Sequence, residues 1–255
     1  MQDILIIPTY DRPEMLWLCL EFLAASPESN SVQVRVVVDA HVNQPPPPRT
    51  EILEVLEKFP QLSLQVGFRP SHQFPGNSFN VLMAYRDAYE TEAELIFMVE
   101  DDVLISPDFF DWHRCHHAIT PLACTIGVQN PGHGAYASLG VCFRREFFRL
   151  LLPHCRAAYF QNMRNYCRSY FPASPFDCEQ DGLLARLLKD YPVLWAKTPK
   201  AQHVGWYGYH RKKSIRPTGT LEQRFEQVKA TLRSEVALSS LMKDFGDIRT
   251  LPPCN

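Results

Sequence analysis

The sequence predicts an α/β fold, in which helices flank a mostly parallel central sheet, in a single domain covering residues 1–255. Three observations support this prediction. Over the first hundred residues, short β-branched runs alternate with longer helical segments, as in strand–helix–strand units of a doubly wound sheet. The runs at 4–7 and 95–99 are continuously apolar, which is typical of strands covered on both faces. A chain of 255 residues with 45% apolar residues can bury a sizeable core.

The first strand is predicted at 4–7, where four aliphatic residues precede Pro8. We expect a helix to begin at Pro13, because proline is tolerated in the first helical turn. Four consecutive prolines within 43–49 can continue neither a helix nor a strand and predict an extended loop. The other elements predicted in this half are strands at 32–38, 62–66 and 95–99 and helices at 50–59 and 79–89.

The second half has a more mixed pattern. It predicts a helix near 107–117, a strand near 126–129, a strand-to-helix step across 141–152 and a helix at 179–189.

Composition limits the classes of partner. The net charge of -2 gives no overall field that gathers nucleic acid. No run approaches the roughly 20 apolar residues of a membrane span, and the amino terminus lacks a basic start typical of a secretory signal. Eight cysteines without a Cys-x-x-Cys pair indicate reduced thiols. The sequence therefore predicts a cytoplasmic protein with no nucleic-acid partner and no membrane span.

Three adjacent acids, Glu100, Asp101 and Asp102, follow the most hydrophobic predicted strand. In a doubly wound fold, ligands bind at the carboxyl ends of the strands. Adjacent carboxylates repel unless a cation compensates them, and Mg²⁺ or Mn²⁺ binds both carboxylate and phosphate oxygens. The alternative is a solvated acidic turn before the next helix, for which Ser106-Pro107-Asp108 is a plausible start.

The segment 97–103, followed by 106–110, resembles the Glu-Asp-Asp segment of N-acetylglucosaminyltransferase I and its relatives. This resemblance implies the GT-A (Rossmann-like) fold, with a nucleotide-sugar-binding half at 1–105 and an acceptor-binding half at 106–255. It also implies a UDP-sugar donor bound with Mn²⁺ (or Mg²⁺). Asp102 would contact the metal, Asp101 the ribose or sugar, and Glu100 the nucleotide.

The loop after the first strand is similar to the Thr-x-Asn-Arg-Pro turn of many GT-A enzymes. The resemblance assigns the nucleotide to this loop and to the ends of the next two strands. Each residue taken alone has an alternative role as a cap or turn residue. The expected donor-binding residues here are Pro8, Thr9, Tyr10, Asp11, Arg12, Asp39, Arg69 and Asn77.

Two later segments complete the expected site. Residues 176–181 resemble the acidic pair on the acceptor side of inverting GT-A enzymes, with Asp181 as the catalytic base and Glu179 as the alternative; helix starts also simply prefer acids. Residues 201–205 resemble a Gln-His-Val-Gly segment whose histidine, His203, approaches the diphosphate or the metal. A buried histidine bonded to the backbone is the alternative. The basic segment after it, including Arg211, would close over the leaving diphosphate.

Together these features predict a metal-dependent inverting glycosyltransferase that moves N-acetylglucosamine or another hexose from a UDP-sugar to a carbohydrate or glycoconjugate acceptor. A sugar-phosphate nucleotidyltransferase is one alternative, although residues 8–13 contain no glycine for a phosphate loop. A non-catalytic carbohydrate- or nucleotide-binding protein of the same fold is another. A zinc site at His113 and His117, which share a helix face, is a further alternative.

Overall fold

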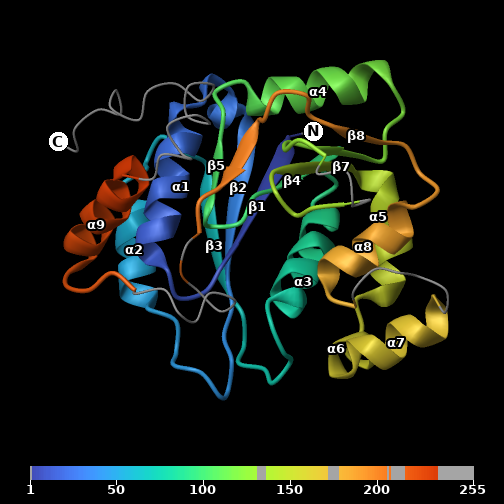
Figure 1. The fold of residues 1–255 in the computed structure, drawn as a ribbon, viewed down its shortest axis with the longest axis horizontal. Coiled ribbons are helices and arrows are strands. Elements are labelled where there is room, and N and C mark those ends of the chain that lie inside the picture. Colours follow the sequence, from blue (N-terminus) through green and yellow to red (C-terminus); the bar gives the residue numbers. More distant parts are fainter. Residues whose placement is uncertain (1, 131–135, 172–177, 206, 208–215, 235–255) are drawn as a thin grey trace.

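The structure is a computed structural model that describes residues 2–130, 136–171, 178–205, 207 and 216–234. Its central sheet has seven strands in the order β3-β2-β1-β4-β7-β6-β8, and β5 pairs with β9 in a second sheet (Figure 1). The strands are β1 (Asp3–Thr9), β2 (Val32–Val38), β3 (Leu64–Phe68), β4 (Leu95–Met98), β5 (Val103–Ile105), β6 (Cys124–Ile126), β7 (Val141–Arg144), β8 (Val193–Trp195) and β9 (Ala201–His203).

The sheet is mostly parallel, as predicted. β1 pairs in parallel with β2 and β4, β2 with β3, and β6 with β8. β7 is the exception, because it runs antiparallel to both β4 and β6. A parallel return from β6 to β7 would require a crossover of a dozen or more residues, usually a helix. The described part of the chain between these strands contains no helix, which fits their antiparallel pairing.

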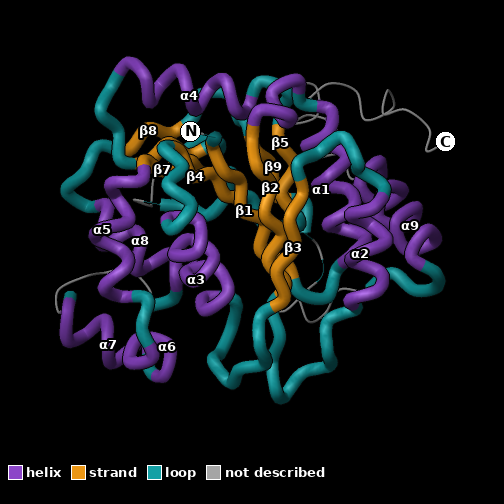
Figure 2. The backbone as a smooth tube through the Cα atoms, turned by 180° about the vertical axis from the view of Figure 1, so that it is seen from behind, coloured by secondary structure: helices purple, strands orange, loops and turns teal. Residues whose placement is uncertain are grey.

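Helices cover both faces of the sheet (Figures 1 and 2). Residues 5 and 7 of β1 belong to a core with α1, α2 and α9, whereas residues 4 and 6 belong to a core with α3, α5 and α8. This alternation follows from the period of two along a strand. The helices are α1 (Pro13–Ala25), α2 (Arg49–Glu57), α3 (Ser78–Tyr89), α4 (Phe109–Ile119), α5 (Phe148–Leu151), α6 (Ala157–Gln161), α7 (Met163–Tyr170), α8 (Gln180–Leu188) and α9 (Leu221–Ser234).

Several predicted boundaries are correct and others are wrong. The helix that begins at Pro13 and the strand at 32–38 match the structure, and the prolines within 43–49 lie in a loop. The strand predicted at 62–66 lies two residues later, and the one predicted near 126–129 lies at Cys124–Ile126. The short elements β5, β8, β9, α6 and α7, and the last helix α9, were not predicted.

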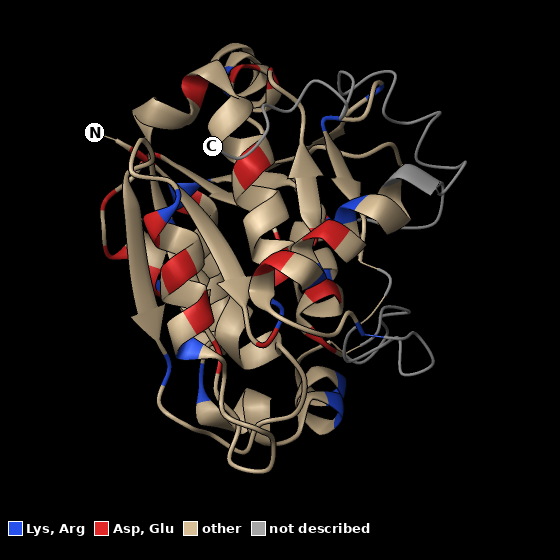
Figure 3. Cartoon of the chain, turned by 90° about the vertical axis from the view of Figure 1, so that its left-hand side faces the viewer, with Lys and Arg blue, Asp and Glu red and all other residues tan. Residues whose placement is uncertain are grey.

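The surface on the side of α2 and α9 carries both signs of charge (Figure 3). Glu51 of α2 accepts a hydrogen bond from Arg224 of α9, and the Lys58 Nζ lies 3.8 Å from Glu222 Oε1. None of the helices in the described ranges has the length and apolar character needed to cross a membrane.

Candidate functional site

A cavity of about 800 Å³ lies where the loops that follow β1, β2, β3 and β4 meet. The strand ends gather there because β2, β1 and β4 are neighbouring parallel strands. Thr9 ends β1, Asp39 follows β2, and the acidic run follows β4. The predicted residues that line the cavity are Pro8, Thr9, Tyr10, Asp11, Arg12, Asp39, Asn77, Glu100, Asp101, Asp102 and His203.

Arg12 compensates two of the three acids. Its guanidinium donates to Asp101 and, at 2.6 Å, to Asp102 Oδ2, while the three side chains are 17%, 2% and 6% exposed. The same group donates to the Tyr207 carbonyl at 3.1 Å. Thr9 Oγ1 donates to the other oxygen of Asp101 at 2.6 Å. In this structure, therefore, the cation beside the acidic run is a side chain of the protein itself.

The surroundings give the three acids different protonation. Burial raises the pKa of Asp101 to about 6, although Arg12 acts in the opposite direction. Burial also acts to raise the pKa of Asp102, but Arg12 and His203 outweigh it and hold that pKa below its usual range. Burial, followed by the charges of Asp102 and Asp181, raises the pKa of Glu100 well above its usual range. Asp102 is thus the acid that stays ionised most readily.

The two carboxylate oxygens of Asp102 differ in their contacts with the described residues. Oδ2 accepts from Arg12 and lies 3.3 Å from His203 Nε2, whereas the buried Oδ1 has no hydrogen-bond partner among the residues that the structure describes. A buried carboxylate oxygen without a partner is costly unless a ligand or ion satisfies it. Gly205 shapes the same place, because a Cβ there would overlap Asp102 Oδ2 and lie 3.0 Å from His203 Nε2. A carboxylate oxygen and an imidazole nitrogen at this spot fit Mn²⁺.

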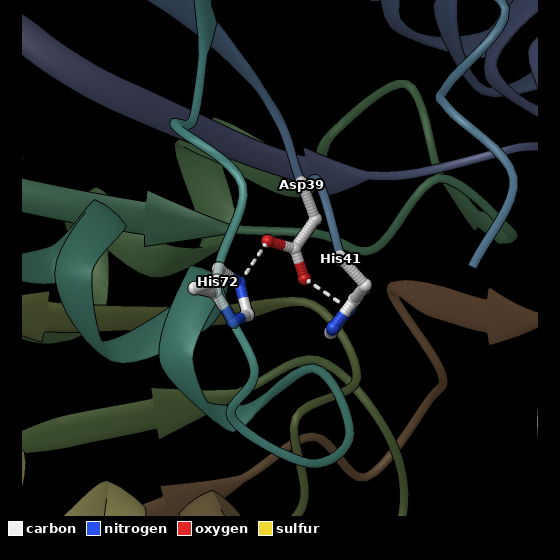
Figure 4. Close-up of side chains that lie close together, drawn as sticks. All are labelled: Asp39, His41 and His72. Carbon is white, nitrogen blue, oxygen red and sulfur yellow. Dashed lines mark hydrogen bonds and ion pairs between the residues drawn. The ribbon is translucent and has the colours of Figure 1, made fainter. Parts of the chain in front are cut away.

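A second group of metal-type ligands, which the sequence analysis missed, lies at the end of β2. Ligand atoms of Asp39, His41 and His72 lie within 4.8 Å of one another (Figure 4). His72 Nε2 is 2.7 Å from Asp39 Oδ1, and His41 Nε2 is 3.0 Å from Oδ2. The Ala40 N–H also donates to Oδ1, at 3.0 Å.

The hydrogen-bond directions in this group favour a polar network over a metal site. The backbone N–H of Phe74 donates to His72 Nδ1 at 3.2 Å, so a neutral ring carries its proton on Nε2, which faces Asp39. A histidine that binds a metal through Nε2 needs that lone pair and normally donates from its other nitrogen. His72 and His41 therefore serve to hold the Asp39 carboxylate in place as an acceptor.

Three predicted residues lie outside the cavity lining. The Arg69 guanidinium bonds Asp87 at 2.6 Å and Asn80 at 3.2 Å, so we leave it out of the proposed site. Asp181, in the first turn of α8, accepts a hydrogen bond from Ser138 Oγ. Glu179 is exposed just before that helix. Arg211 is outside the described residues.

The pair proposed as an alternative zinc site has a structural role. His113 and His117 are 0% and 2% exposed, and Thr125 Oγ1 bridges them at 2.5 and 3.0 Å. Burial lowers the pKa of both histidines, to about 4 for His117. They are neutral side chains that pack α4 on the sheet.

Other residues that line the cavity were not expected from the sequence. His41 and His72 had a usable signal, because each follows a predicted strand whose end lies at the ligand edge. Phe74 lines the cavity beside them. Tyr207 had no such signal: its hydroxyl donates to Glu14 of α1, and that contact joins residues 193 positions apart.

The fold resembles those of solved glycosyltransferases. S. aureus TarS 1–349 in complex with UDP-GlcNAc aligns with a TM-score of 0.56 and 14% identity, over 98% of this chain and 72% of that chain. Mannosyltransferase PcManGT from Pyrobaculum calidifontis, in complex with GDP-Man and Mn²⁺, aligns with a TM-score of 0.56 and 14% identity, over 95% of this chain and 78% of that one.

The chain is shorter than these proteins: other alignments cover 48% of TarS 1–349 and 41% of S. aureus TarS. Neither a protein-family model nor a curated protein sequence matches this chain. At these identities the likeness establishes the fold, an α/β architecture with a seven-stranded, mostly parallel sheet that it shares with nucleotide-sugar glycosyltransferases.

Proposed function

We propose that this protein is a metal-dependent inverting glycosyltransferase that moves N-acetylglucosamine or another hexose from a UDP-sugar to a carbohydrate hydroxyl. The observation that carries the proposal is the Asp102 carboxylate at the ligand edge of the sheet: its buried Oδ1 has no partner among the described residues, and its Oδ2 lies 3.3 Å from His203 Nε2. The cavity of about 800 Å³ is large enough for a nucleotide sugar. The solved complexes of TarS with UDP-GlcNAc, and of PcManGT with GDP-Man and Mn²⁺, support the same ligand class.

On the donor side, we assign Asp39 as the acceptor of the imide N–H of uracil. Its contacts with His41 and His72 support this role, because they hold the carboxylate at the cavity wall. Asp102 and His203 would hold Mn²⁺ (or Mg²⁺), which supplies positive charge to the departing diphosphate. Arg12 keeps Asp101 compensated beside that centre.

On the acceptor side, we assign Asp181 as the base that removes the proton from the attacking hydroxyl. Its charge raises the pKa of Glu100, so the two carboxyls are close enough to interact. Ser78 Oγ donates to Gln180 Oε1 at 2.5 Å and joins the start of α8 to the start of α3, next to the cavity-lining Asn77. Attack opposite the leaving diphosphate inverts the anomeric carbon. Glu179 remains the alternative base.

The decisive experiment measures thermal unfolding with UDP, in the presence and absence of Mn²⁺. A ligand that binds only the folded protein raises the unfolding midpoint. We expect UDP to protect the wild-type protein more strongly with Mn²⁺. Asp102→Asn should lose this Mn²⁺-dependent part, whereas Asp181→Asn should keep it and lose sugar transfer.

Each comparison is made between shifts within one variant, because Asp102→Asn also weakens the ion pair with Arg12 and lowers the starting midpoint. Equal protection by UDP with and without Mn²⁺ would contradict the metal assignment. Protection by GDP but not by UDP would contradict the donor. Circular dichroism of both variants shows that the fold is retained.

A further inference from the structure

A long segment of the second half is basic and free of acids. Between Glu146 and Asp177 the sequence contains four arginines and no Asp or Glu, although the whole chain has 28 acidic residues. Its described part includes α5, α6 and α7. This surface therefore differs from the α2 and α9 side, where charges of both signs are paired (Figure 3).

Three of these arginines have no interaction partner among the described residues. Elsewhere in the described chain, every arginine with a described side chain forms an ion pair, a side-chain hydrogen bond or a contact with an aromatic ring. Arg149, Arg164 and Arg168 form none of these, and all three are exposed. Unpaired arginines concentrated in one segment give a local positive field despite the net charge of -2.

Helix α7 arranges two of them with aromatic neighbours. Arg164 and Arg168 lie four positions apart and so share one side of the helix. Tyr166 and Tyr170 stack on each other with ring centres 4.4 Å apart. Arg156 lies 5.2 Å from each of these ring centres and donates to both hydroxyls.

This surface adjoins the cavity. Phe160 of α6 packs on Phe74, a cavity-lining residue, with ring centres 5.5 Å apart, and on Phe79 at 5.1 Å. Figures 1 and 2 both place α6 and α7 at the end of the molecule where the loops after β2 and β3 lie. A ligand on α7 would therefore lie next to α6, the helix that packs on the cavity wall.

We propose that Arg156, Arg164, Arg168 and Tyr170 bind an anionic carbohydrate acceptor, one that bears phosphate, sulfate or carboxylate groups. The planar guanidinium fork matches such groups, and arginine and tyrosine together are typical of recognition surfaces. Within the described part of this segment, Tyr170 is the one exposed large hydrophobic side chain. A helix that inserts into a membrane surface presents a broad apolar face instead. The acceptor role rests on the proposed function.

The test measures binding of sulfated dextran oligosaccharides, with neutral dextran of the same length as the reference probe. We expect the wild-type protein to bind the sulfated probe, and Arg164→Gln/Arg168→Gln to weaken that binding by about tenfold or more, because two charged contacts are lost. The matched control is Lys189→Gln/Lys197→Gln, which removes the same charge from exposed positions outside the segment. It should retain the binding.

Equal binding of both dextrans, or an equal loss in both double variants, would overturn the proposal. Tighter binding to phosphatidylserine vesicles or to a single-stranded oligonucleotide would assign the surface to a membrane or to nucleic acid and also overturn it. The UDP and Mn²⁺ measurement on the same preparation is independent. If UDP fails to protect while the sulfated probe binds, the glycosyltransferase proposal fails and the anion-binding surface stands.

Discussion

Replacing Arg12 by methionine tests how the buried acids are compensated. Arg12 is bonded to two carboxylates that are 2% and 6% exposed, and it also donates to the Tyr207 carbonyl. Methionine fills most of the space of the arginine stem but carries no charge. After this substitution, Thr9 is the one described side chain still bonded to Asp101. His203 is the one described side chain still bonded to Asp102.

Removing one partner of a buried ion pair costs about 3–5 kcal/mol, because an uncompensated charge stays buried. We expect a cost near the lower end of this range, because Asp101, whose pKa is about 6, can take up a proton when Arg12 is removed. In a chain of this length each kcal/mol lowers the unfolding midpoint by about 2–4 °C. We therefore expect Arg12→Met to lower the midpoint by roughly 6–12 °C at pH 7.5.

The assay is thermal unfolding followed by circular dichroism, with and without Mn²⁺. Because a divalent ion restores the missing positive charge, we expect Mn²⁺ to stabilise Arg12→Met more than the wild-type protein. Arg35→Met is the matched control, since the hydrogen bonds of Arg35 with described residues are all to neutral groups, the Asp87 carbonyl and Gln65. A midpoint for Arg12→Met equal to that of the control would refute the reasoning.

Two further predictions follow from buried groups. Gly205→Ala should abolish Mn²⁺-dependent protection by UDP in thermal unfolding, because the added Cβ displaces the Asp102 carboxylate and His203; retained protection would contradict this placement of the metal. The pKa of His117 falls to about 4 when folded, below its usual 6.5, so its contribution to stability is complete above pH 6.5 and is lost as the pH falls toward 4. Between pH 7 and pH 4, the free energy of unfolding measured with urea should fall by about 3 kcal/mol less in His117→Gln than in the wild-type protein. Parallel pH profiles of the two proteins would contradict the assignment.

The ligand edge of the site could be predicted because it is encoded locally. Continuous apolar runs identify buried parallel strands, and the residue after each run lies at the carboxyl edge. Asp39 and the acidic run followed directly from this rule. His41 and His72 follow the same rule at a greater distance, because they lie three and four residues beyond the ends of their strands, within loops.

The rest of the fold depends on contacts that are distant in the sequence. β9 has only three residues, and it exists because it pairs with β5, about a hundred positions away. α7 has no aliphatic stripe; its buried residues are Tyr166 and Cys167. β8 is half-buried at the edge of the sheet, so its pattern resembles a loop. None of these segments carries a periodic signal of its own.

The three acids look equivalent in the sequence, and only their neighbours give them different chemistry. Both oxygens of Asp101 are engaged, by Arg12 and by Thr9, so this residue acts as an anchor. Glu100 is the acid whose pKa burial raises well above its usual range. Of the three, only Asp102 combines a lowered pKa with a buried oxygen that has no partner in the described part of the chain. Under the proposed function, this oxygen would give a single, monodentate contact to a divalent ion, and His203, the diphosphate and water would supply the remaining ligands. The ion would then bind weakly without nucleotide, and donor and ion would bind together.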